Sequence, residues 1–217
     1  MIVSVLVFVN LVMKSYAEPA WKNPADTIKL EEFFVDSLHI GKKKFDKVEI
    51  SRFSSSDSFL VVIKFYSRAG EAWSLNQTFN FPKDDIIGCD PKLSDFNNDG
   101  FKDLTYISDV AARGANEVRR LFIYDKVKDR LVYMKNSEDY PNIRYNKTLH
   151  CIDAFLVYGG CSTVFLKIKG NKLVEFASVD LDDGLSFTRS TAKDTGKLSG
   201  MRQRPKCFMY GSPIISL

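Results

Sequence analysis

The chain contains few histidines, and its net charge is small. The 217 residues include two histidines, and 31 basic against 27 acidic residues leave a formal net charge of +4. With so few histidines and no Cys-x-x-Cys pair, the sequence does not favour a tetrahedral zinc site. The mixed charge is typical of a solvated surface rather than of the basic patch that binds nucleic acid.

Short catalytic motifs are also missing. There is no Gly-x-Ser-x-Gly, no His-Glu-x-x-His and no glycine loop of the kind that cradles phosphate. His150 stands next to Cys151, but neighbouring side chains in a strand point to opposite faces, so the two do not form a thiol–imidazole dyad. We therefore expect a binding protein rather than an enzyme.

The first residues are apolar. The run from Met1 to Met13 ends at Lys14, which is short of the roughly 20 residues that a membrane span requires. Ser15-Tyr16-Ala17 follows as a small-x-small cleavage pattern. We expect residues 1–17 to be a signal peptide and residues 18–217 to be one periplasmic or secreted domain. A buried helix or an anchor are the alternatives, because no Lys or Arg precedes the apolar run.

An even number of cysteines in an exported chain predicts disulfides. The four are Cys89, Cys151, Cys161 and Cys207, and four cysteines allow three pairings. Cys151 and Cys161 flank the turn-forming Tyr158-Gly159-Gly160, so we expect a local bridge there and a second between Cys89 and Cys207. Free buried thiols are the alternative.

Most of the chain has the pattern of short β-strands. Residues 58–66 are rich in aromatic and β-branched residues and lie between polar turns, which is typical of a strand. Two pairs of segments are typical of hairpins, 120–124 with 130–133 and 164–168 with 172–176. Residues 27–38 fit a strand pair or a short helix, and residues 182–200 a long loop before a last strand near Cys207. The expected fold is mainly β, with antiparallel hairpins in a small propeller-like, sandwich or barrel architecture.

One acidic loop carries the clearest chemical signal. Asp95, Asn97 and Asp99 alternate before Gly100, and Asp103 follows. A hard cation such as Ca²⁺ takes six to eight oxygens, and alternate positions of a tightly curled loop direct their side chains at one centre. Gly100 permits the sharp turn, after which Phe101 can offer its backbone carbonyl. The predicted calcium ligands are Asp95, Asn97, Asp99, Phe101 and Asp103.

This loop differs from an EF-hand at its end. Tyr106 stands where the bidentate Glu would be, and Leu104-Thr105-Tyr106-Ile107 has the composition of a strand rather than of an exiting helix. Three carboxylates without that Glu predict weak binding, around 10⁻⁴ M, suited to a calcium-rich compartment. An Asp/Asn-rich hairpin that binds nothing is the alternative.

The pattern Asp-x-Asn-x-Asp-Gly-x-x-Asp followed by Leu104 and by Phe122-Ile123-Tyr124-Asp125 resembles FG-GAP-type calcium loops. The stretch from about Leu93 to Val179 is similar to a group of exported bacterial proteins related to periplasmic lysozyme inhibitors and to secretion-system immunity proteins. The resemblance implies a small β fold, a bound Ca²⁺ and a peptidoglycan hydrolase or lysozyme-like toxin as partner.

The contact surface of such an inhibitor is expected on a protruding loop. Residues 136–147 contain Tyr140, Arg144 and Tyr145, which could place hydrogen-bond donors between the two carboxylates of a glycosidase. An ordinary exposed connection is the alternative for this segment. For the whole protein, a calcium-dependent adhesion or carbohydrate-binding module is the alternative function.

Overall fold

The computed structural model describes residues 28–56, 58–181 and 185–188. These residues form strands in three antiparallel sheets, with two short 3₁₀ helices, so the prediction of a mainly β fold is confirmed. The predicted signal peptide at residues 1–17 lies outside the described part of the chain.

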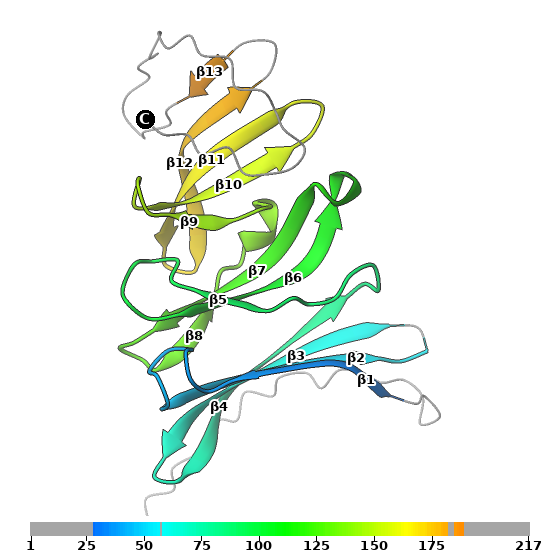
Figure 1. Cartoon of the computed structure of the whole chain (residues 1–217), viewed down its shortest axis with the longest axis vertical. Helices are drawn as coiled ribbons and strands as arrows, with labels where there is room; N and C mark the ends of the chain where they lie inside the picture. Colours follow the sequence, from blue (N-terminus) through cyan, green and yellow to red (C-terminus); the bar gives the residue numbers. More distant parts are fainter. Residues whose placement is uncertain (1–27, 57, 182–184, 189–217) are drawn as a thin grey trace, which may run out of the picture.

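Each sheet is built from consecutive stretches of the chain (Figure 1). The first sheet has the order β1-β2-β3-β4, from Lys29–Asp36, Asp46–Ser54, Phe59–Ala69 and Ala72–Lys83. The middle sheet has the order β5-β6-β7-β8, from Lys92–Ser94, Asp103–Ala111, Asn116–Asp125 and Arg130–Tyr133. The third sheet has the order β13-β12-β11-β10-β9, from Leu185–Thr188, Lys172–Leu181, Cys161–Lys169, Cys151–Val157 and Arg144–Asn146. The helices η1 (Ala112–Gly114) and η2 (Ser137–Asp139) lie in connections.

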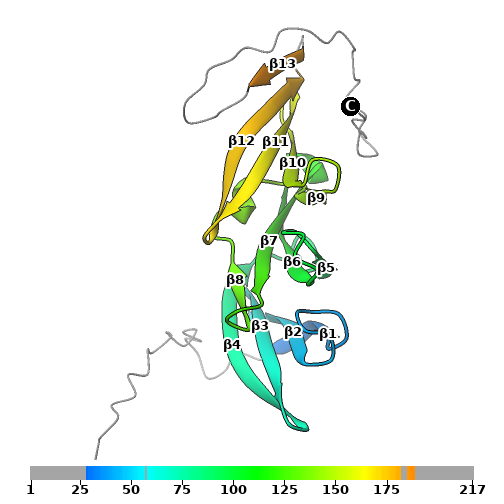
Figure 2. The same ribbon diagram turned by 90° about the vertical axis from the view of Figure 1, so that its left-hand side faces the viewer.

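The middle sheet is covered on both faces, as the two views show (Figures 1 and 2). Phe122 and Tyr124 of β7 belong to a core shared with the first sheet, whereas Leu121 and Ile123 belong to a core shared with the third sheet. Successive side chains of a strand point to opposite faces, so a strand buried on both sides needs an uninterrupted apolar run. That run is what the sequence has at residues 121–124.

Most of the predicted local structure is confirmed. The hairpins at 120–133 and 164–176 correspond to β7–β8 and β11–β12, and the strand at 58–66 lies in β3. Residues 27–38, left open between a strand pair and a short helix, contain the single strand β1. The predicted loop at 182–200 is wrong in part, because it contains β13, which pairs with β12. The strand predicted near Cys207 lies outside the described residues.

The three sheets stack as layers, which matches the sandwich architecture among those predicted. Within the described strands no sheet closes on itself, so a barrel is not formed. No helix in the described part of the chain is long and apolar enough to span a membrane.

Side-chain amides connect the sheets, because each forms two hydrogen bonds with the backbone of one residue in the neighbouring layer. Asn136 donates to the carbonyl of Leu173 and accepts its N–H, both at 2.8 Å. Asn116 does the same to Val157, at 2.8 and 2.9 Å. Between the first and middle sheets, Gln77 donates to the carbonyl of Leu131 at 3.1 Å and accepts its N–H at 2.7 Å. An amide carries both a donor and an acceptor, so each of these residues satisfies a complete backbone peptide pair.

The expected disulfide pairing is wrong. Cys89 and Cys151 are free buried thiols, so neither the Cys151–Cys161 nor the Cys89–Cys207 bridge forms. The register explains the first failure: Cys161 lies opposite Val157, six residues along β10 from Cys151, or roughly 20 Å at the rise of a strand. A disulfide requires Cα atoms within about 7 Å. Cys161 is disulfide-bonded, and Cys207 lies outside the described residues.

We predict that Asn136→Asp destabilises the stack by about 1–3 kcal/mol, because the carboxylate cannot donate to the Leu173 carbonyl. Urea unfolding at neutral pH measures the change. Asn80→Asp is the matched control, because Asn80 is exposed on β4; it should change the free energy of unfolding by less than about 0.5 kcal/mol. Equal effects of the two changes would contradict a structural role for the Asn136 amide.

Candidate functional site

The predicted calcium loop connects β5 to β6. It begins after Ser94, the last residue of β5, and ends at Asp103, the first residue of β6. The prediction that the loop leads into a strand rather than a helix is confirmed. The loop is therefore fixed at both ends in the middle sheet.

The side chains of the loop accept hydrogen bonds from the loop's own backbone. Asp95 accepts the N–H groups of Asp99 at 3.2 Å and of Gly100 at 2.9 Å. Asn97 accepts the N–H of Asp99 at 3.2 Å, and Asp99 accepts that of Phe101 at 3.0 Å. The three predicted side-chain ligands thus face the inside of one curl of backbone.

Two residues of the curl have left-handed backbone conformations. Asn98 has φ of 57° and Gly100 has φ of 89°. Asparagine and glycine are the residues that adopt this region most readily. The glycine in the motif is thus explained by the backbone conformation rather than by crowding, because a Cβ there would meet no atom within 4 Å.

Asp103 is the structural anchor of the loop. Its carboxylate is fully buried, and it accepts the N–H of Phe96 at 2.7 Å and the N–H of Tyr124 at 2.8 Å. Burial raises the pKa of Asp103 to about 7 against the lowering effect of these two hydrogen bonds, and the charges of Asp95 and Asp99 raise it further. Three carboxylates therefore interact at this loop.

The donor set fits Ca²⁺ better than a metal that prefers nitrogen or sulfur, because every donor is oxygen. Within the described residues, no three His, Cys, Asp or Glu side chains come together in a ready-made metal group. The amide oxygen of Asn97 and the carbonyl of Phe101 would therefore have to complete any shell around a cation.

The loop lies where the two hydrophobic cores meet. Phe96 is buried in the core between the middle and third sheets, whereas Phe101 packs against the core between the first and middle sheets. The ring of Phe101 lies 5.5 Å from that of Tyr124. A bridge between Ile40 and Lys102 ties the loop to the connection after β1. The order of this one loop thus affects the packing of all three layers.

Two acidic residues lie near Tyr124: the half-buried Asp129 in the β7–β8 turn and the buried Asp46 of the first sheet. Asp129 accepts the hydroxyl protons of Tyr124 at 2.6 Å and of Ser67 at 2.8 Å, and Lys42 Nζ lies 3.2 Å from it. Asp46 is fully buried and accepts the Lys42 N–H at 2.6 Å through Oδ2. Its Oδ1 has no hydrogen-bond partner among the described residues.

The two carboxyl groups differ in their pKa. Burial raises the pKa of Asp46, and the charge of Asp129 raises it further. Burial also acts on Asp129, but the hydrogen bonds from Tyr124, Ser67 and Lys42 outweigh it and lower its pKa. The sequence did not predict that Asp46 and Asp129 lie near each other, because they come from distant parts of the chain. The one local signal is that Asp46 occupies an inward-facing position of β2, where buried and half-buried residues alternate.

The predicted contact residues have structural contacts of their own. Tyr140 packs against the core between the middle and third sheets. The Nε of Arg144 donates to Asp153 at 2.7 Å while 46% of its side chain stays exposed. The Tyr145 hydroxyl lies 3.4 Å from Nδ1 of His150. Among the three, Arg144 is therefore both fixed in position and accessible.

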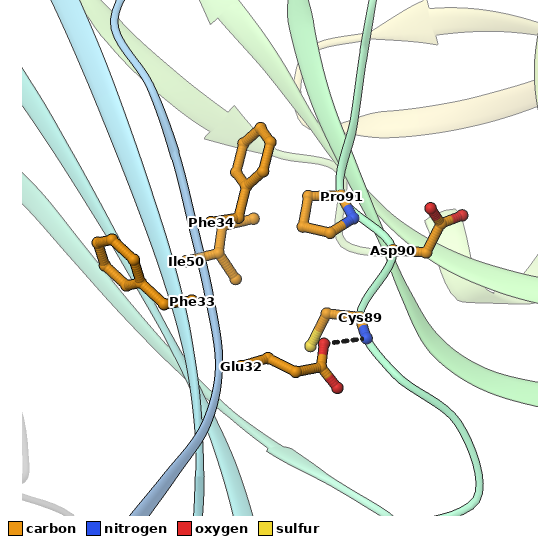
Figure 3. A pocket seen from close by; sticks show the side chains of 7 residues that line it. All are labelled: Glu32, Phe33, Phe34, Ile50, Cys89, Asp90 and Pro91. Carbon is orange, nitrogen blue, oxygen red and sulfur yellow. Dashed lines mark hydrogen bonds between the residues drawn. The ribbon is translucent and has the colours of Figure 1, made fainter.

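A pocket of about 410 Å³ lies between β1 and the segment before β5 (Figure 3). Its lining includes Phe34, Ile50 and Pro91 beside the carboxylate of Glu32, which accepts the Cys89 N–H at 2.8 Å. Burial and the Glu32 charge raise the pKa of the Cys89 thiol to about 12. The thiolate is the nucleophilic form, so Cys89 is not an activated nucleophile.

The comparisons with known proteins do not assign the chain to a family. No family model matches the chain, and no curated protein matches it. One solved structure, described as that of a Xanthomonas type IV secretion system related protein, is 17% identical over 81% of this chain and 98% of that chain, with a TM-score of 0.49. A likeness of this degree carries no conclusion about what the present chain does.

We predict that Asp46→Asn stabilises the protein near neutral pH by about 1 kcal/mol, because it removes a buried carboxylate oxygen without a donor. A raised folded-state pKa means that stability is full below the unfolded pKa of about 3.9 and is lost as the pH rises toward the folded value. Asp46→Asn should therefore flatten the fall in stability above about pH 4, as measured by urea unfolding across pH.

The matched control is Asp129→Asn. The pKa of Asp129 is lowered, so its contribution to stability is present above the unfolded pKa and this variant should be less stable than the parent at neutral pH. If Asp46→Asn also lost stability at neutral pH, Asp46 would be shown to act as a paired carboxylate.

Proposed function

We propose that the protein is an exported calcium-binding protein that docks onto a peptidoglycan hydrolase and inhibits it. The observation that supports the calcium part is the hydrogen-bond pattern of the 95–103 loop, in which Asp95, Asn97 and Asp99 accept backbone N–H groups of one tight curl. The hydrolase part is supported by the resemblance of this loop and of the following hairpins to exported inhibitor and immunity proteins.

The proposed ligands are the side chains of Asp95, Asn97 and Asp99, the carbonyl of Phe101 and the carboxylate of Asp103. Both oxygens of Asp103 already accept a backbone N–H, but each carboxylate oxygen has two lone pairs. Asp103 can therefore contribute directly or through a bridging water, as the ninth position of such loops does.

The role of the cation is structural in this proposal. Metal binding that orders a loop adds its free energy to folding. This loop contributes Phe96 to one core and Phe101 to the other, so an ordered loop holds both. A bound Ca²⁺ would also offset the mutual repulsion of Asp95, Asp99 and Asp103.

Calcium should raise the melting temperature of the demetallated full-length mature protein, and calorimetric titration should show binding. Asp99→Asn should weaken the affinity by about tenfold, because it removes one charge from the ligand set and can keep an oxygen acceptor for the Phe101 N–H. Asp139→Asn is the matched control, because Asp139 is exposed in η2, and should bind Ca²⁺ like the parent. No heat and no thermal shift with the parent protein would contradict the calcium assignment.

Inhibition of a hydrolase is a separate step in the proposal. The catalytic carboxylates of glycosidases lie roughly 5 to 9.5 Å apart, a spacing that a planar, multi-donor guanidinium can span. Arg144 is the best placed donor of residues 136–147, since Asp153 holds it at 2.7 Å. Tyr140 is less suited to contact a partner because it packs on the core.

The test is a panel of lysozyme-like and other peptidoglycan hydrolases, assayed on purified cell wall with and without the protein. At least one should be inhibited and should form a complex that survives size-exclusion chromatography. Arg144→Ala should weaken that inhibition, whereas Arg130→Ala should not; the two side chains are equally exposed, at 46% and 47%. No inhibition across the panel would overturn the hydrolase part and leave the calcium part standing.

A further inference from the structure

The first sheet has an unpaired edge. β1 pairs with β2 on one side, and no described strand pairs with its other side. Proteins usually protect such an edge with proline, with a lysine in mid-strand or with a covering segment. β1 has the sequence Lys-Leu-Glu-Glu-Phe-Phe-Val-Asp, which has no proline and its single lysine only at the first position.

The outer face of this edge strand is apolar. Leu30, Phe33 and Val35 are 51%, 56% and 50% exposed. The register assigns Phe34 to the inner face, because it lies opposite the buried Ile50, whereas Phe33 and Val35 lie opposite Ser51 and Glu49. Phe33 is also one of the residues that line the pocket of Figure 3, so its exposed ring borders that pocket. Leu30, Phe33 and Val35 are thus exposed to solvent beside the unpaired backbone edge of β1.

A bulge in β1 makes the strand complementary to itself. Leu30 lies opposite Phe53 and Glu32 opposite Arg52, so Glu31 is an extra residue in the strand. If two copies of β1 pair antiparallel with Phe33 opposite Phe33 of the second copy, and each Glu31 stays outside the count, Leu30 lies opposite Val35. The same register places Lys29 opposite Asp36. The two members of each pair then lie on the same face of the joined sheet, as strand geometry requires: Phe33 with Phe33 and Leu30 with Val35 on the outer face, and Lys29 with Asp36 on the inner face.

We propose that two copies of this chain associate edge to edge through β1, about a twofold axis at Phe33. The two first sheets would join into one continuous antiparallel sheet of eight strands. The interface is isologous, as expected for a twofold dimer. On the outer face the pairs Phe33 with Phe33 and Leu30 with Val35 are apolar, whereas on the inner face Glu32 lies opposite Phe34. The outermost pairs, Lys29 with Asp36, are opposite in charge, which is the favourable arrangement for cross-strand neighbours.

Self-complementarity favours a second copy over an unrelated peptide as occupant. Any extended chain could hydrogen-bond to the free backbone, but β1 matches its own reverse at the apolar positions of its outer face, Leu30, Phe33 and Val35, and at its charged ends, Lys29 and Asp36. The Lys29 side chain is 70% exposed and pairs with Glu31 at 3.0 Å, and Asp36 accepts the N–H groups of His39 and Ile40 at 2.8 and 2.9 Å. A Lys29–Asp36 pair between two copies would exchange the first of these contacts and add to the others. The inner side of the strand is kept in place by Glu32, which binds Arg52 at 2.8 Å and the Cys89 N–H at 2.8 Å.

The first test is the mass of the full mature chain by light scattering after size-exclusion chromatography. The parent should be a dimer in a concentration-dependent equilibrium. Phe33→Lys should be a monomer, because it sets like charges opposite each other at the axis. Leu75→Lys is the matched control, since Leu75 is 51% exposed on β4 at the opposite edge of the same sheet, and it should remain a dimer.

The second test checks the register. A mixture of Phe33→Lys with Phe33→Glu should recover the dimer, because the two charges would then lie opposite each other. Phe33→Cys should form an intermolecular disulfide on oxidation, whereas Val35→Cys, which lies opposite Leu30, should not. Circular dichroism of each variant checks that it is folded.

A monomeric parent at every concentration up to its solubility limit would overturn the proposal. So would a dimer that Phe33→Lys leaves intact, or a mixture of the two charge variants that stays monomeric. None of these three results depends on whether calcium or a hydrolase binds.

Discussion

One buried carboxylate holds together parts of the chain that would otherwise be independent. Asp103 has no solvent exposure, and its two oxygens accept the backbone N–H groups of Phe96 and of Tyr124. Phe96 lies in one core and Tyr124 in the other. A buried acceptor left without donors costs about 1–3 kcal/mol, so the loop, the middle sheet and both cores are constrained to one arrangement by this group.

Because β7 is buried on both faces, the hydrogen bonds of Asp103 affect the cores on both sides of the middle sheet. Because Leu121 and Ile123 face one core while Phe122 and Tyr124 face the other, movement of β7 disturbs both interfaces of the stack. The amide pairs of Asn116 and Gln77 add polar connections to the third and first sheets. A cation bound in the loop would act on this shared element, which is why a calcium site here is proposed to govern stability rather than chemistry.

The sequence predicts local structure well and long-range arrangement poorly. Aromatic and β-branched composition between polar turns predicted β3 and the hairpins of β7–β8 and β11–β12, and the spacing around Gly100 predicted the sharp turn of the loop. The cysteine pairing failed because a turn between Cys151 and Cys161 says nothing of how far apart the register sets them. Asp46 was missed because its burial is decided by strands distant in sequence. The calcium ligands and the partner stay predictions.

Hydrogen exchange of the demetallated protein with and without Ca²⁺ tests the central claim most directly. If the loop governs both cores, calcium should slow exchange of the amides of Phe96 and Tyr124, the two that donate to Asp103, together with the neighbouring amides of β7. Protection confined to residues 97–101, with β7 unchanged, would contradict the account and reduce the loop to a surface feature.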